Sequence, residues 1–419
     1  MRNASLCVSY SRHWSLTTQS SALSPQSSTM RRRNLIVFTL FLLIAAGVVA
    51  SQFMFRWSRD TFLNPSPPLN ISVLYSSELR AWLQPAAEEF NRQNNKLAGQ
   101  RVQVELEAVD DGQAMRSIAN GERTPTAWIP ASTIWVNLLN NQWRANHQTD
   151  LLLRSGEYGT TPMVLTPMVF VMYADRADTF IKSKSTIDWQ QIQQAVTAPG
   201  GWKDLGGPEE WGRVKYSQTK ASTSNAGLLA VTLATYSYFN KTGGLTSGEL
   251  DNDGYRTWMD GLASGLVADT PPTAEQQMDD VLRYGASRYD VVSIYESLVA
   301  QQIKNAPGRF GTSLKVFYPR LNIWSDYPFS ILMSEQSTAE QKDAASLFMR
   351  YLYSREVQEK ALLAGFRPAN PDVPLLTNDP NNPFNRYKDA GLDIRIPRTV
   401  IADTPTGEVL SRLMNVLER

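Results

Sequence analysis

The chain has 419 residues, of which 42% are apolar, and its 41 Lys and Arg residues nearly balance its 40 Asp and Glu residues. This composition supplies enough core for two domains or for one large two-lobed domain, and it excludes a wholly disordered chain. The balanced charge, with no basic stripe among aromatic residues, argues against nucleic acid as a partner.

Cysteine and histidine are scarce, since the chain holds only Cys7, His13 and His147. The first two precede a hydrophobic segment, so the chain beyond it has one histidine and no cysteine. That excludes disulfides, a Cys-rich metal site and a Cys nucleophile there. A Ser-His-Asp triad would need His147, which lies in a polar stretch, and no serine has a nucleophile-elbow sequence around it. We therefore predict no catalytic residue, no metal site and no cofactor, and a protein that is not an enzyme.

An N-terminal hydrophobic segment predicts export. Three arginines, Arg31 to Arg33, precede an uncharged apolar run from Leu35 to about Phe55. At about 1.5 Å per residue this run is long enough to span the hydrocarbon core of a membrane. The arginines place the N-terminus in the cytoplasm and the rest outside. We predict a disordered cytoplasmic N-terminus (1–33), a transmembrane helix or signal segment (34–56) and a linker (57–69).

Two fates of this segment remain open. Val48 and Ala50 offer a small-residue site for cleavage of a secretory signal, which would give a secreted protein. Alternatively the segment stays as a single-pass anchor of the cell membrane, with the main domain extracytoplasmic. The apolar run continues past Ala50 to Phe55, which favours the anchor. Met30 directly precedes the arginines and would also serve as a start, which leaves open whether residues 1–29 are translated.

Residues 71–129 predict a β-α-β-α-β arrangement. Apolar residues indicate strands at 71–75, 102–109 and 127–129, and helical spacing indicates helices at 79–90 and 114–120. This order favours a parallel, doubly wound sheet. Each strand is followed by polar residues: Ser76 and Ser77, then Asp110 and Asp111, then Ser132. Such turns cap helices, but in open α/β sheets they also bind ligands. Three of them at one sheet predict a shared site.

The second half of the chain repeats this pattern. A long apolar strand at 163–173 contains Pro167, which is typical of a sheet edge or of a crossing between lobes. A strand at 214–216 leads through a polar turn into a helix at 228–238, and a strand at 290–294 ends at Tyr295-Glu296. A further strand is expected at 314–319 and a helix pair at 338–365.

The order of these motifs resembles that of the bacterial extracellular solute-binding proteins, which have the type II periplasmic-binding-protein fold. It is closest to their molybdate- and sulfate-binding group, and the resemblance covers about residues 70–370. The motifs that carry it are Tyr75-Ser76-Ser77, Ile118-Ala119-Asn120-Gly121, Trp128-Ile129-Pro130-Ala131-Ser132, Ser222-Thr223-Ser224-Asn225-Ala226-Gly227, Tyr295-Glu296, Tyr318-Pro319, Asp326-Tyr327-Pro328 and Gly365-Phe366-Arg367-Pro368.

The resemblance implies an α/β fold of two lobes, each a doubly wound mixed sheet, with ligand in the cleft between them. Lobe one would comprise residues 70–160 and, with a C-terminal extension, 313–419; lobe two would comprise 161–312. The ligand contacts that it implies are Ser76, Ser77, Ser132, Ser222, Thr223, Ser224, Glu296 and Tyr318. Asp111-Gly112 stands where many relatives have Gly-Ser. A carboxylate repels an oxyanion, so Asp111 and Glu296 favour a cationic, polyol or peptide-like ligand over sulfate or molybdate.

We therefore expect a protein that captures a small molecule by hinge closure, in an ABC-type uptake or sensing system, with a membrane permease or an envelope protein as partner. An alternative is a membrane-anchored interaction or scaffold protein of the cell envelope that uses the same fold without transport. A retained anchor would favour this alternative.

Overall fold

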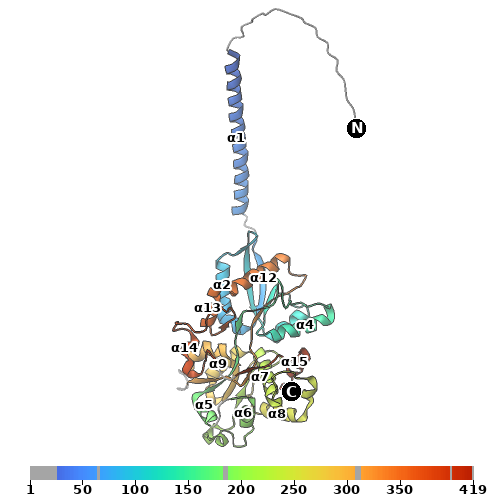
Figure 1. The fold of residues 1–419 in the computed structure, drawn as a ribbon, viewed down its shortest axis with the longest axis vertical. Helices are drawn as coiled ribbons and strands as arrows, with labels where there is room; N and C mark the ends of the chain where they lie inside the picture. The colour runs from blue at the N-terminus through green and yellow to red at the C-terminus, as the bar shows by residue number, and fades with distance from the viewer. Residues whose placement is uncertain (1–25, 64–66, 183–186, 307–312, 397–398, 418–419) are drawn as a thin grey trace, which may run out of the picture. The chain divides into compact units, whose positions relative to one another are not determined.

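The computed structural model describes residues 26–63, 67–182, 187–306, 313–396 and 399–417. The chain divides into two compact units, residues 1–66 and residues 67–419 (Figure 1).

The first unit contains one long helix, α1 (Gln26–Leu63). Its stretch Arg33–Met54 has a mean hydropathy of 2.4, and none of it is buried. By length and composition this stretch could cross a membrane, and it is the only such helix in the described part of the chain. A signal sequence near the N-terminus has the same properties.

Helix α1 is longer than the segment predicted to span the membrane. Residues 26–33 are helical where we predicted disorder, and the helix continues to Leu63 where we predicted a linker from residue 57. Its sequence contains a single glycine, Gly47, and no proline, so no residue interrupts the helix before Pro65.

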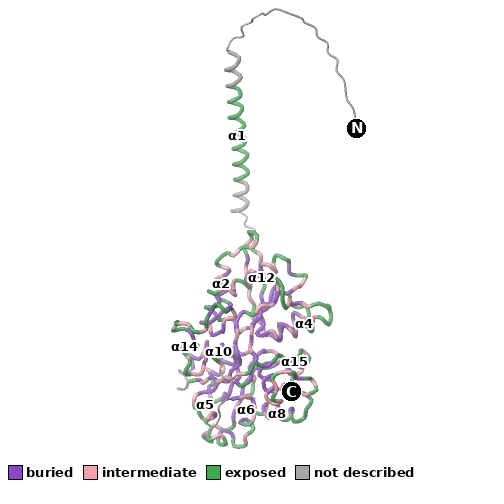
Figure 2. The backbone as a smooth tube through the Cα atoms, in the orientation of Figure 1, coloured by how far each residue is buried: buried purple, intermediate pink, exposed green. Residues whose placement is uncertain are grey.

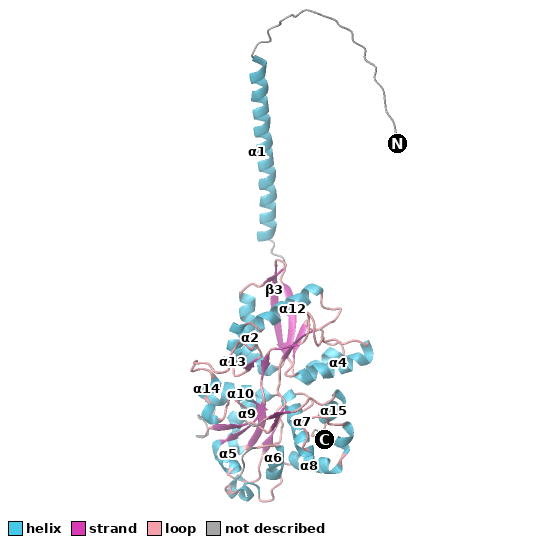
Figure 3. Ribbon diagram, viewed as in Figure 1, coloured by secondary structure: helices cyan, strands magenta, loops and turns pink. Residues whose placement is uncertain are grey.

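The second unit contains two larger sheets and two two-stranded ones (Figure 3). The larger has the order β2-β3-β1-β4-β12-β5, and we call it, with its helices, lobe 1. Strand β1 runs parallel to β3 and β4, whereas β12 is antiparallel to β4 and β5. The predicted β-α-β-α-β order is confirmed here. The elements of lobe 1 are β1 (Leu69–Tyr75), α2 (Arg80–Arg92), β2 (Lys96–Leu97), β3 (Gln100–Ala108), α3 (Asp111–Ala119), β4 (Ala127–Ile129), α4 (Thr133–His147), β5 (Thr161–Pro162), β12 (Pro328–Ile331), α12 (Ala339–Leu352) and α13 (Arg355–Leu363).

The smaller sheet has the order β10-β7-β9-β8, and we call it, with its helices, lobe 2. Helix α7 is buried along its length from Asn225 to Tyr236 (Figure 2), as expected for a helix that is apolar on all sides. The elements of lobe 2 are β7 (Met168–Tyr173), α5 (Ala174–Ile181), α6 (Trp189–Val196), β8 (Tyr216–Ser217), α7 (Asn225–Phe239), α8 (Asp253–Ala263), α9 (Ala274–Tyr284), β9 (Val291–Tyr295), α10 (Glu296–Gln302) and β10 (Leu314–Phe317).

The chain passes between the lobes at a narrow crossing. The predicted strand 163–173 is divided into β6 (Val164–Leu165) and β7, with Pro167 between them. Thr166 and Ser325 pair across the crossing, because each backbone N–H donates to the other's carbonyl at 2.9 Å. Strand β13 (Arg367–Pro368) pairs with β6 beside them. This is a crossing between the lobes of the kind that Pro167 suggested.

The C-terminal part differs from the predicted boundary. We placed residues 313–419 with lobe 1, but β10 (Leu314–Phe317) pairs with β7 in the sheet of lobe 2. Short β11 (Leu321–Asn322) and β14 (Val400–Ile401) pair with each other. The last helix, α15 (Gly407–Leu413), packs against both α7 and α4. An alternating strand such as β10 reveals its buried face but not which sheet it joins.

Candidate functional site

The turns that follow the strands of lobe 1 bring three polar side chains together. The backbone N–H of Ser76 bonds Ile129 O at 3.0 Å, which holds the turn after β1 beside the turn after β4. Asp111, at the start of α3, accepts a bond from Ala131 N at 3.0 Å. The Ser76 hydroxyl donates to Asp111 Oδ2 at 3.2 Å and also to the carboxylate of Glu78. The three turns thus form one hydrogen-bonded cluster at the carboxyl edge of the sheet.

Lobe 2 meets this cluster directly. Gly112 N donates to Thr223 O at 3.1 Å, and Arg116 Nη1 donates to Ser222 O at 3.2 Å. A Cβ atom built on Gly112 would lie 2.2 Å from Ser222 O, so only glycine permits this approach. Arg80 of α2 also lies 3.6 Å from the carboxylate of Glu275 in α9. The two lobes are therefore in contact, as in a closed cleft.

A small pocket of about 170 Å³ lies between these surfaces. Its lining is formed by hydroxyl and carboxyl groups from both lobes, and in the described part of the chain it contains no Lys or Arg. The lining residues are Ser76, Ser77, Glu78, Asp110, Asp111, Thr223, Ser224 and Thr273.

The pocket lining is acidic, and the pKa values of its carboxyl groups are raised. Burial raises the pKa of Glu78, and the nearby Glu275 and Asp110 raise it further against the bond from Ser76. Burial also raises the pKa of Asp111 well above its usual range, and the Glu78 charge adds to that effect. The pKa of Asp110 is raised by burial alone. Carboxyl groups that resist ionisation in this way are stabilised by an arriving positive charge.

The structure brings five of the predicted contacts into the pocket lining: Ser76, Ser77, Asp111, Thr223 and Ser224. Ser132 does not line it, because its hydroxyl caps α4 by accepting a bond from Ile134 N at 3.2 Å. Ser222 lies at the contact between the lobes, where its carbonyl oxygen accepts the bond from Arg116.

Glu296 and Tyr318 lie outside the pocket lining. Glu296 is fully buried and forms two bonds with the Arg367 guanidinium, both 2.7 Å long. The Tyr318 hydroxyl also donates to it. Arg367 further donates to the carbonyls of Asp393 and Ile394, at 2.6 and 2.9 Å. Because Arg367 neutralises Glu296, this carboxylate adds no net charge to the cleft, contrary to the role we predicted for it.

Three lining residues were absent from the predicted contacts. Glu78 stands in the short helical turn after β1, where an acidic residue is common at any helix start. Asp110 directly precedes Asp111 and was visible in the same polar turn. Thr273 caps α9 by accepting a bond from Gln276 N at 3.2 Å. A capping threonine is a strong local signal, but only the closed cleft brings it to Ser76.

Two α/β lobes joined by a hinge, with polar helix starts lining the cleft, define a binding protein. The family model for bacterial extracellular solute-binding proteins matches residues 71–367. The chain belongs to this family, which consists of binding proteins rather than enzymes, and the resemblance in the sequence is confirmed. The membership and the apolar N-terminal helix, a signal or an anchor, agree on an extracytoplasmic main domain.

Individual relatives are distant. The uncharacterized proteins MT1884 and Rv1836c, from two strains of Mycobacterium tuberculosis, are each 22% identical over 364 residues, which is 82% of this chain. The chain spans about half the length of these relatives, since the match covers 50% of each.

Among solved structures, the periplasmic binding protein AfuA from Actinobacillus pleuropneumoniae is 14% identical, with a TM-score of 0.56 over 83% of this chain and 96% of that one. The sulfate-binding protein SubI from M. tuberculosis H37Rv is 15% identical, with a TM-score of 0.50 over 81% and 95%. These likenesses confirm the predicted fold.

Proposed function

We propose that this chain is the solute receptor of an ABC-type uptake or sensing system, anchored by α1, and that it closes its lobes over a small cationic ligand. The observation that carries the ligand class is the pocket lining, which holds the carboxyl groups of Glu78, Asp110 and Asp111 and, among the described residues, no basic side chain.

Charge decides between ligand classes here. Two unit charges 4 Å apart interact with about 4 kcal/mol at an effective dielectric constant near 20. An oxyanion 4 Å from the one ionised carboxylate of the Glu78 and Asp111 pair would therefore be repelled by an amount that lowers affinity roughly a thousandfold. A cation would gain a similar attraction and would take the place of the proton that the raised pKa values of the pair favour. Ser76, Ser77 and Thr223 add hydroxyl groups that can orient its polar parts.

Closure follows from the division of the pocket between the lobes. Ser76, Glu78 and Asp111 belong to lobe 1, whereas Thr223 and Thr273 belong to lobe 2. A ligand reaches both sets only when the lobes meet, so its binding favours the closed state. The paired backbone at Thr166 and Ser325 supplies the axis about which the lobes turn.

Spin-label distances in the full chain test this proposal. Cys7 is the only cysteine, so Cys7→Ser allows labels at Arg101→Cys in lobe 1 and Glu210→Cys in lobe 2, two exposed positions. A library of cationic, neutral and anionic solutes is screened by thermal shift, and each hit is measured for label distance. We expect cationic solutes to bind, and each should shorten the mean distance between the two labels and narrow its distribution. Hits confined to anions would contradict the ligand class, and the absence of any hit would contradict the receptor function.

Matched variants locate the site. Asp111→Asn and Glu78→Gln should each weaken a cationic hit at least tenfold, since each removes a buried charge at the pocket. Glu105→Gln removes an exposed charge from β3 in the same lobe and should leave affinity unchanged.

The second function, a scaffold of the cell envelope, is favoured by α1. Its apolar stretch of 22 residues exceeds the hydrophobic region of a typical signal peptide. N-terminal sequencing of the membrane fraction decides whether α1 is retained, because a mature start at Ser51 would exclude the anchor. If α1 is retained and no solute binds, crosslinking to an envelope protein would support the scaffold over the receptor.

A further inference from the structure

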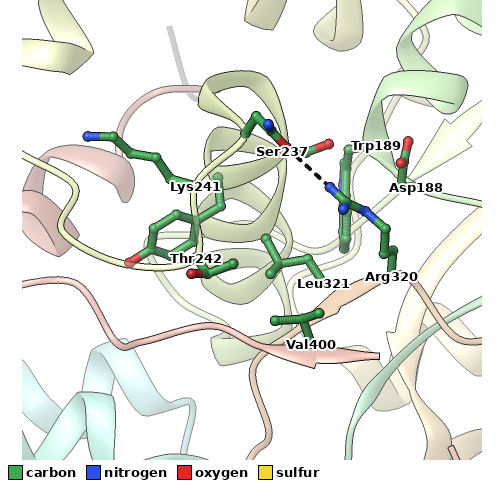
Figure 4. A pocket seen from close by; sticks show the side chains of 10 residues that line it. Asp188, Trp189, Ser237, Lys241, Thr242, Arg320, Leu321 and Val400 are labelled. Carbon is green, nitrogen blue, oxygen red and sulfur yellow. Dashed lines mark hydrogen bonds between the residues drawn. The ribbon is translucent and has the colours of Figure 1, made fainter. Parts of the chain in front are cut away.

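A second pocket lies within lobe 2 and shares no lining residue with the cleft. This pocket of about 450 Å³, part of which is open to solvent, lies at the start of α6, the end of α7 and the strand pair β11–β14 (Figure 4). Its lining residues are Asp188, Trp189, Tyr236, Ser237, Asn240, Lys241, Thr242, Arg320, Leu321 and Val400.

Backbone hydrogen bonds hold these segments together. Asn240 caps the end of helix α7, and its φ of 50° turns the chain so that Lys241 N bonds Tyr236 O at 3.0 Å. Val400 N bonds Arg320 O at 2.7 Å, which joins β14 to β11. Asp403 N bonds Thr242 O at 2.7 Å and closes the ring of segments. The pocket is therefore a fixed feature of the lobe.

The Arg320 guanidinium lies in this pocket without a salt bridge to another described residue. Its Nη2 donates to Asn240 Oδ1 at 3.3 Å, and among the described residues it has no carboxylate within ion-pair distance. Lys241 is already paired with Glu249 at 2.5 Å. The Asp188 carboxylate accepts bonds from Gln190 N and Gln191 N, at 3.0 and 3.2 Å, and so caps α6. The Asp188 charge therefore stays in the lining, directed at the start of α6, while Arg320 keeps unused N–H donors.

Apolar side chains form part of the remaining wall, beside the polar Ser237, Asn240 and Thr242. The Trp189 indole N–H is turned away to the Tyr216 hydroxyl at 3.2 Å, and the Tyr236 hydroxyl is turned to Asp403 O at 2.8 Å. Their rings, with Leu321 and Val400, are therefore what they present to a ligand. Figure 4 shows Arg320 alongside Trp189, with Leu321 and Val400 lining the same space.

We propose that this pocket binds a small organic monoanion, namely a carboxylate with a short apolar body. The planar guanidinium matches a carboxylate with two parallel hydrogen bonds. Arg320 is the one cation of the lining without an ion-pair partner among the described residues, since Lys241 pairs with Glu249. The Asp188 carboxylate would repel a second negative charge on the ligand. Apolar side chains beside a few well-placed polar and charged groups are the usual composition of ligand pockets. This site does not depend on the ligand class of the cleft.

The test uses ligand-observed NMR on the full chain in nanodiscs, with butyrate, hexanoate and benzoate as probes and their neutral amides as matched controls. We expect the carboxylates to bind and the amides to bind roughly tenfold more weakly or not at all. Arg320→Gln should weaken carboxylate binding roughly tenfold, whereas Arg395→Gln, at an exposed position outside the lining, should leave it unchanged.

A second variant tests whether the ligand binds in the pocket or only to an arginine at the surface. Val400 is 46% exposed, so Val400→Trp should fill the pocket without disturbing the core and should abolish binding while Arg320 remains. Three results would overturn the proposal: no probe binds, amides bind as well as carboxylates, or both variants bind like the original chain. Thermal melts of the variants establish that they are folded.

Discussion

The single hydroxyl group of Ser76 is hydrogen-bonded to two carboxyl groups, those of Glu78 and Asp111. A hydroxyl has one proton to donate, so two ionised carboxylates cannot both receive it fully. Protonation of one of the two acids relieves this conflict, which agrees with the raised pKa of both carboxyl groups. The pair therefore titrates as one unit, and a bound cation takes the place of its proton.

The first prediction concerns the pH dependence of ligand binding. Because a cation takes the place of the one proton that the pair holds, that proton competes with it at any pH below its raised pKa. The dissociation constant of a cationic ligand should rise roughly tenfold per pH unit below that pKa and become constant above it. Titration calorimetry across pH measures this profile. Glu78→Gln should shift the rise to lower pH, because Asp111 loses the neighbouring charge that helps to raise its pKa, and an unchanged profile in that variant would contradict the role of the pair.

The second prediction concerns stability. The folded state raises the pKa of Glu78 above its ordinary 4.5, so folding favours the protonated form. Its contribution to stability is present below the unfolded pKa and is lost as pH rises through the folded pKa. Glu78→Gln should therefore raise the melting temperature at pH 8 by roughly 2–4 °C, the effect of about 1 kcal/mol, and change little at pH 4. Glu105→Gln, at an exposed position, is the control.

The sequence predicted those cleft residues whose positions follow from local rules. Ser76 and Asp111 follow parallel strands, and the carboxyl ends of such strands meet at one edge of the sheet. Glu296 follows a strand in the same way, yet its partner Arg367 stands 71 residues further along the chain. No local pattern reveals that such a pairing neutralises a carboxylate. Thr273 was missed for the same reason, because its place beside Ser76 depends on how the lobes close.

The third prediction concerns the contact between the lobes. Gly112→Ala places a methyl group 2.2 Å from Ser222 O in the closed state, although alanine suits the helix α3 in which it stands. The variant should fold normally, favour the open state and bind ligand at least tenfold more weakly. The labels at residues 101 and 210 should report a longer distance. A shorter distance or unchanged affinity would show that this contact does not limit closure.

The fourth prediction concerns the buried ion pair at the crossing. Glu296→Gln leaves the Arg367 charge buried with no carboxylate partner, and should lower the free energy of unfolding by about 3–5 kcal/mol. Denaturant unfolding measures the loss. The exposed pair of Arg355 and Glu359 is the matched control, and Glu359→Gln should have almost no effect. Equal effects of the two substitutions would mean that Glu296 does not stabilise the crossing.

The fifth prediction concerns α15, which contacts both lobes. Arg412 holds this helix to lobe 2 through Asp251, at 2.5 Å, and through Ser247 O, at 2.7 Å. At the other end of the helix, a Cβ on Gly407 would lie 2.1 Å from Asn141 of α4, so the helix also packs closely against lobe 1. Hinge opening must separate α15 from one of these lobes, and α15 therefore favours the closed state.

Loosening α15 from lobe 2 should consequently speed ligand release. Because the Arg412 pair is exposed, Arg412→Gln should raise the dissociation rate only a few-fold and should leave the association rate nearly unchanged. Stopped-flow release of a cationic ligand measures both rates. Arg355→Gln breaks a similar exposed pair within α13 of lobe 1 and should alter neither. If both variants release ligand at the original rate, the contact of α15 with α4 carries no part of the closure energy, and the hinge and the pocket alone must supply it.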